Sequence, residues 1–98
     1  MNEVEKDFKD KAIIREEIFL FSKENALSFI AACQKKKIGI LGIDGFFLIE
    51  DKIQPSSENS IDFSSGDYVR ESGSIYSEAT NFLNEKDEKL FFEIVCSD

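Results

Sequence analysis

Residues 38–49 read IGILGIDGFFLI and form the most apolar run of the 98-residue chain. Runs of this length that are rich in Ile, Leu and Phe are typical of buried strands. The Asp44-Gly45 pair within the run tolerates the left-handed backbone that a two-residue hairpin turn requires. Turn chemistry therefore favours a hairpin that joins strands 38–43 and 46–50.

The same run also fits one long bent strand in which Gly42 and Gly45 form bulges. A bulge accommodates glycine well because the extra residue of the bulge often takes a conformation that other residues avoid. This alternative stays open at the level of the sequence.

A helix is predicted directly before the run, over residues 22–37. Ser22 is a good N-cap, and Glu24 falls in the first turn, near the positive end of the helix dipole. The three lysines at 35–37 fall in the last turn, where cations are favoured, and Gly39 is expected to end the helix.

Upstream, residues 12–21 (AIIREEIFLF) are rich in β-branched and aromatic types, which predicts a strand in their second part. A continuous helix over 3–20 is the rival interpretation. Residues 2–11 are mostly charged, with Val4 and Phe8 four positions apart, which fits either a short helix or a frayed N-terminus.

Downstream, residues 50–66 contain the only proline, Pro55, and many Ser, Asn and Asp residues, so we expect a loop. Ile61 and Phe63 are expected to hold this segment against the body of the protein, as in an Ω-loop or a short edge strand.

A second helix is predicted from an N-cap at Asp67 to about Asn84, although Gly73 weakens its first turns. Its apolar and small side chains recur with the helical period: Tyr68, Ser72, Ile75, Tyr76, Ala79, Phe82 and Leu83. Residues 89–96 (KLFFEIVC) alternate as a strand does.

The predicted fold class is α+β, a small, mostly antiparallel sheet with two main helices packed on one face. The order along the chain is strand, helix, two strands, helix, strand. At 98 residues, the chain has the length of a single domain, 1–98, in which residues 1–11 form a short helical or frayed N-terminus.

The net charge of −8 lies entirely in the second half of the chain. Residues 1–49 hold eight basic and eight acidic side chains, whereas residues 50–98 hold four basic and twelve acidic ones. Binding to nucleic acid or to an anionic membrane depends on basic residues, so this charge argues against both. It favours a basic protein as the partner.

Cys33 and Cys96 each lie in an apolar pattern, and we expect two buried, reduced thiols. Their spacing suits neither a redox motif nor a zinc site, and a disulfide between them is possible in principle but not implied. Since no signal segment or long apolar run is present, we expect a cytoplasmic protein.

The sequence offers no set of catalytic residues, and we predict that the protein is not an enzyme. Histidine is absent, which removes the commonest general base and ligand of catalytic zinc. Residues 39–45 are glycine-rich but match no phosphate-binding motif, and Glu58, Asp62 and Asp67 lack the spacing of a calcium loop. We expect no cofactor and no metal.

The candidate partner-binding surface is the acidic loop and the second helix. Tyr side chains provide rigid contact area, and carboxylates accept bidentate hydrogen bonds from arginine. The predicted contact residues are Glu58, Asp62, Asp67, Tyr68, Glu71, Tyr76 and Glu78. An ordinary acidic surface with aromatic residues in the core remains the alternative interpretation.

Four segments together suggest a family: ILGIDGF at Ile40–Phe46, Pro55, IDFS at Ile61–Ser64 and FFEIV at Phe91–Val95. Over residues 26–95 the chain resembles the small immunity proteins encoded beside bacterial polymorphic toxins, including those of contact-dependent growth inhibition. The resemblance implies that the protein binds one toxin domain, often a cationic nuclease, and blocks it in the producing cell. It transfers no contact residues.

The leading hypothesis is therefore a cytoplasmic immunity protein that binds a basic toxin one to one. The alternative is an acidic adaptor, secretion chaperone or scaffold domain that acts by self-association.

Overall fold

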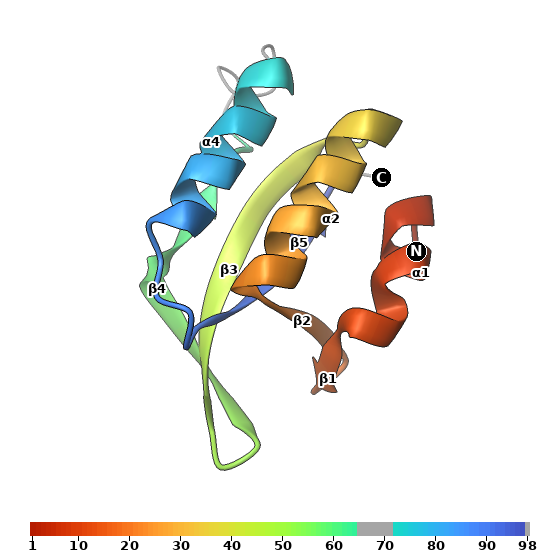
Figure 1. Cartoon of the computed structure of the whole chain (residues 1–98). Helices are drawn as coiled ribbons and strands as arrows, with labels where there is room; N and C mark the ends of the chain where they lie inside the picture. The colour runs from red at the N-terminus through yellow and green to blue at the C-terminus, as the bar shows by residue number, and fades with distance from the viewer. Residues whose placement is uncertain (65–71, 98) are drawn as a thin grey trace.

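The computed structural model describes residues 1–64 and 72–97, and it has an α+β fold (Figure 1). Its elements in chain order are α1 (Glu3–Phe8), the 3₁₀ turn η1 (Lys9–Lys11), β1 (Ile13–Arg15), β2 (Ile18–Ser22), α2 (Lys23–Lys36), β3 (Ile40–Ile49), β4 (Lys52–Asp62), α4 (Ser72–Asn84) and β5 (Phe91–Cys96).

All pairs in the five-stranded sheet are antiparallel, and the strand order is β1-β2-β5-β3-β4. The helices α2 and α4 lie side by side on one face of this sheet, and α1 lies beyond α2 (Figure 1). The predicted fold class is therefore confirmed.

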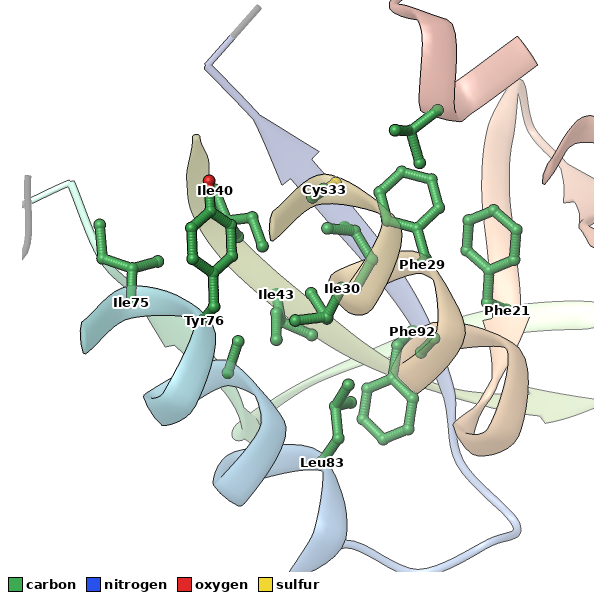
Figure 2. Packing of buried hydrophobic residues seen from close by; sticks show 14 of the residues in the cluster. Phe21, Phe29, Ile30, Cys33, Ile40, Ile43, Ile75, Tyr76, Leu83 and Phe92 are labelled. Carbon is green, nitrogen blue, oxygen red and sulfur yellow. The ribbon is translucent and has the colours of Figure 1, made fainter. Parts of the chain in front are cut away.

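The core lies between the two main helices and this face of the sheet (Figure 2). Ile30 of α2 and Leu83 of α4 point towards Ile43 and Phe92 of the sheet, and each is at most 1% exposed. Phe29 of α2 packs instead against Phe21 of β2, with ring centroids 5.1 Å apart. Because alternate residues of a strand point to opposite faces, the neighbours of Ile43 and Phe92 in the sequence point away from the helices.

The preferred hairpin over 38–50 is wrong, and the bent strand is correct. β3 runs through Asp44 and Gly45 without turning, and its pairing with β4 shifts between Ile43 and Gly45. Gly45 is required by a close approach, because a Cβ there would overlap the backbone oxygen of Asn59. The glycine thus serves the packing of two strands, a need that a local turn signal does not reveal.

The chain reverses instead at Glu50 and Asp51, whose φ angles of 50° and 69° place both in the left-handed region. A two-residue turn with both φ angles positive is the type I′ geometry, which matches the twist of the flanking strands. The turn contains neither glycine nor asparagine, the residues that favour this geometry, so the sequence did not predict it.

The predicted loop over 50–66 is wrong for most of its length, since Lys52–Asp62 form the edge strand β4. An edge position explains how a strand tolerates Pro55, because proline lacks the N–H that a central strand would use. The expected anchoring is confirmed, since Phe63 is fully buried and Ile61 packs against the core.

The N-terminal segment is a short helix followed by a hairpin, so the rival helix over 3–20 is wrong. Asn2 and Glu5 form a reciprocal capping box at the start of α1. β1 and β2 are joined at Glu16 and Glu17, whose φ angles are also 50° and 69°.

The two main helices begin and end close to the predicted residues where the structure describes them. Ser22 caps α2 by accepting a hydrogen bond from the backbone N–H of Asn25. The helix ends at Lys37, in the left-handed region, and not at Gly39. α4 ends at Asn84 as predicted, while its predicted cap, Asp67, lies outside the described residues.

Candidate interaction surface

The face of the sheet that points away from α2 and α4 is called the open face here. Its positions follow from the alternation of β3 and from the residues paired with them. On β3, β4 and β5 they are Gly42, Asp44, Phe46 and Leu48, then Ile53, Pro55 and Asp62, and then Phe91, Glu93 and Val95. On β1 and β2 the same face holds Ile13, Arg15, Ile18 and Leu20.

One end of the open face is shielded from water. Leu20 and Phe46 are 0% and 5% exposed, although neither belongs to the main core cluster. At this end, Arg15 beside the β1–β2 turn lies 3.4 Å from Asp51 of the β3–β4 turn. This ion pair joins the hairpins at opposite edges of the sheet. The sheet must therefore curl over its open face at this end, where it covers Leu20 and Phe46.

At the other end, the open face is accessible and acidic. Asp44 and Glu93 are paired directly across β3 and β5, so their side chains leave the same face next to each other. Asp62 lies on the opposite side of β3, and it lines an open hollow of about 320 Å³ together with Asp44 and the exposed Val95.

Glu93 occupies an unfavourable electrostatic environment. Partial burial removes water from the Glu93 carboxylate, and the nearby charge of Asp44 repels its ionised form. Both effects raise the pKa of Glu93. Like charges directly opposite each other in an antiparallel pair destabilise the sheet. The fold therefore keeps two carboxylates together at a cost in stability.

Asp62 differs from Glu93 because it already has hydrogen-bond donors. Ser64 donates from its hydroxyl and its backbone N–H, the latter at 2.8 Å, and these bonds lower the pKa of Asp62. This carboxylate is fully exposed and stays ionised across the physiological range. The accessible end thus combines one firmly ionised carboxylate with a repulsive pair.

No open-face position of β3, β4 or β5 is occupied by Lys or Arg. Arg15 of β1 shares the face of Leu20, at the shielded end, where it pairs with Asp51. Within residues 1–64 and 72–97, the two ion pairs are Arg15–Asp51 and Lys36–Glu3, and neither involves the accessible carboxylates. A cation to balance Asp44 and Glu93 is therefore not supplied by the described part of the chain.

The four predicted contact residues that the structure describes do not form one surface. Asp62 lies on the open face, whereas Glu78 is exposed on α4, in the helix layer. Glu58 lies in the bulged part of β4, where its backbone oxygen accepts a hydrogen bond from Lys86 Nζ at 3.3 Å.

Tyr76 is 6% exposed, and its hydroxyl donates a 2.7 Å hydrogen bond to the backbone oxygen of Ile38. Its ring belongs to the core, which is the alternative that the sequence left open. Asp67, Tyr68 and Glu71 lie outside the described residues.

Asp44 and Glu93 were not among the predicted contact residues. The local sequence pattern predicts a turn at Asp44 and indicates for Glu93 only a polar position in an alternating strand. The signal was that each is a charged residue inside an otherwise apolar run, ILGIDGF and LFFEIV. The pairing of β3 with β5, which brings them together, cannot be read from either run alone.

No family model matches the chain, and a search of curated proteins returned no match. In the part of the chain that is described, no helix is long and apolar enough to cross a membrane. The same residues contain no group of three or more His, Cys, Asp or Glu side chains placed to hold a metal ion.

Proposed function

We propose that this protein is a cytoplasmic inhibitor that binds a basic protein, one to one, through the accessible end of its open face. The observation that carries the proposal is the Asp44–Glu93 pair, which is held together at a cost and has no cation beside it among the described residues. Arrangements that reduce stability are expected at functional sites.

A cationic side chain from the partner would remove the repulsion. An arginine guanidinium can donate to two carboxylates at once, and its charge would favour the ionised form of Glu93. Val95 and the half-buried Phe91 flank the pair on β5 and would provide apolar contact around it. Binding energy would thus come partly from relieving a strain that exists in the unbound protein.

The resemblance to immunity proteins of polymorphic toxins supports the same proposal. A nuclease toxin is basic around its substrate groove because it must bind phosphates. An acidic protein that occupies this groove replaces the phosphates and excludes the substrate. The net charge of −8 would also accelerate association at low salt.

The test uses the gene immediately upstream of this one. If it encodes a secreted protein with a toxic C-terminal domain, that domain alone should stop growth, and co-expression of this chain should restore it. The purified pair should form a 1:1 complex in sedimentation, and its association rate should fall as salt rises. A toxin that stays active in the presence of this chain would contradict the proposal.

One observation supports the scaffold alternative. Phe47 and Ile49 are 41% and 54% exposed, and both lie on the same side of the β3–β4 hairpin, beyond the residues that pair with β5. Such an apolar pair on a projecting hairpin can mediate self-association. Sedimentation of the chain alone distinguishes the two functions, since the scaffold requires a dimer that persists at micromolar concentration.

A further inference from the structure

The two cysteines of the chain lie together in the folded protein. Cys33, in the last turn of α2, is fully buried in the core cluster, and Cys96, the last residue of β5, packs against that cluster. Their thiols are hydrogen-bonded to each other, and neither sulfur is in a disulfide.

The backbone around the two thiols is held from both sides. The oxygen of Cys33 accepts a 2.9 Å hydrogen bond from the N–H of Ile38, two residues before β3 begins. Cys96 is then paired with Ile40, and the N–H of Ser97 donates to the oxygen of Gly39 at 2.9 Å. These bonds fix the end of α2 over the end of β5, so the contact between the thiols is part of the fold.

We propose that Cys33 and Cys96 form a reversible intramolecular disulfide when the protein meets a small-molecule disulfide such as oxidised glutathione. The bond would tie α2 covalently to the last strand of the sheet. This inference is independent of the proposed partner.

The reaction balances as two thiol–disulfide exchanges. Cys96, the more exposed thiol, loses its proton and attacks one sulfur of oxidised glutathione, which releases one glutathione thiolate. Cys33 then loses its proton and attacks the Cys96 sulfur of the mixed disulfide, which releases the second glutathione. The two cysteine sulfurs are oxidised by two electrons, and two molecules of reduced glutathione carry away the two protons.

The burial of Cys33 and its contact with Cys96 favour this order of attack. The hydrogen bond with Cys96, burial, and the nearby charges of Cys96 and Glu5 all raise the pKa of the Cys33 thiol. A thiol with a raised pKa is a poor first nucleophile because little thiolate is present. Once Cys96 carries a glutathione, however, Cys33 already lies beside the sulfur that it must attack.

The experiment incubates the full, folded chain in glutathione buffers at pH ~8, where thiolates are more abundant. Intact mass under non-reducing conditions should show the loss of two hydrogen atoms in the oxidised buffer and their return in the reduced one. Peptide mapping should link Cys33 to Cys96. The oxidised chain should also unfold at a higher urea concentration, because the bond closes a long loop in the unfolded state.

The variant Cys33→Ala is the matched control, because it should retain glutathione on Cys96 as a stable adduct. Four results with the native chain would overturn the proposal: a persistent glutathione adduct on Cys96, no reaction in the oxidised buffer, a disulfide between two copies, or an intramolecular bond that forms only in urea. The native chain decides the question even if the variant fails to fold.

Discussion

At the scale of single residues, the fold places two carboxylates, those of Glu93 and Asp44, beside each other. Glu93 is the polar residue of a strand whose alternate residues enter the core, and it directly faces Asp44 on β3. Both side chains are partly buried, so water screens their repulsion less than it would at an exposed site. Neutralising one of the two carboxylates should therefore stabilise the protein, whereas most substitutions destabilise it.

We expect Glu93→Gln to stabilise the protein at neutral pH by roughly 0.2–1 kcal/mol. The pKa of Glu93 is raised in the folded state, so its ionisation destabilises the fold above the ordinary Glu range. The stability linked to Glu93 is present at lower pH and is lost as the pH rises through the raised value. Urea unfolding should show the gain at pH ~7 and little gain near pH ~4.

The control for this prediction is Glu78→Gln, which removes the same charge from an exposed position of α4. Its stability should stay within about 0.5 kcal/mol of the native value at both pH values. An equal gain in the two variants would mean that net charge alone, and not the cross-strand pair, sets the effect.

A second residue with a specific prediction is Gly45. Substitution to alanine should destabilise the protein by about 1–3 kcal/mol, because the added Cβ would overlap the backbone oxygen and the Cβ of Asn59. Thermal unfolding is the measurement. Gly39→Ala is the matched variant, because its added Cβ would meet the hydroxyl and Cβ of Ser97, a side chain that can rotate away. A larger loss of stability in Gly39→Ala than in Gly45→Ala would contradict this packing.

At the scale of elements, both hairpin turns use acidic residues where glycine and asparagine are favoured. Glu16, Glu17, Glu50 and Asp51 all have positive φ angles. A left-handed backbone at a residue with a Cβ costs of the order of 1 kcal/mol. The two turns therefore add negative charge at the joined hairpin tips at some cost in stability.

Replacing Glu16-Glu17 by Asn-Gly should raise stability by about 1 kcal/mol, because this pair suits a type I′ turn. The turn at 16–17 is preferable to the one at 50–51, since Asp51 also pairs with Arg15. Chemical denaturation would measure the gain. A loss of stability would show that the glutamates make contacts that their φ angles do not reveal.

How far the elements could be predicted depended on whether their signals were local. The helix caps and the alternating β5 depend on neighbouring residues, so α2, the end of α4 and β5 were predicted well. Asp44-Gly45 was read as a turn because the sequence does not show that β4 approaches Gly45. The serines and Pro55 indicated a loop because an edge strand tolerates residues that a central strand excludes.

The candidate site was predicted only in part for the same reason. The sequence indicated an acidic surface and included Asp62, but the face was decided by the pairing of β3 with β5 and β4. These pairings join residues that are far apart in the chain, and no local pattern specifies them. Tyr76 follows the helical period equally well as a core residue, which is its place in the structure.

At the scale of the whole molecule, charge and layers are distributed unevenly. The helix layer mixes both signs, with lysines at both ends of α2 and both lysines and carboxylates along α1 and η1. The open-face positions of β3, β4 and β5 have carboxylates and no Lys or Arg. Such a molecule orients itself in the field of a basic partner before contact is made. The orientation predicted by this asymmetry places the sheet, and not the helices, against the partner.

The most direct test of this account compares two double variants in binding to the proposed partner, a basic toxin domain. Asp44→Asn/Glu93→Gln and Glu58→Gln/Glu78→Gln remove the same net charge, the first from the open face and the second from the bulge of β4 and from α4. Equal charge makes long-range attraction equal, so the difference in dissociation constant reports the docking face. We predict that Asp44→Asn/Glu93→Gln raises the dissociation constant at least about tenfold and that Glu58→Gln/Glu78→Gln raises it less than about threefold. Equal losses of affinity, or a larger loss from Glu58→Gln/Glu78→Gln, would contradict the account.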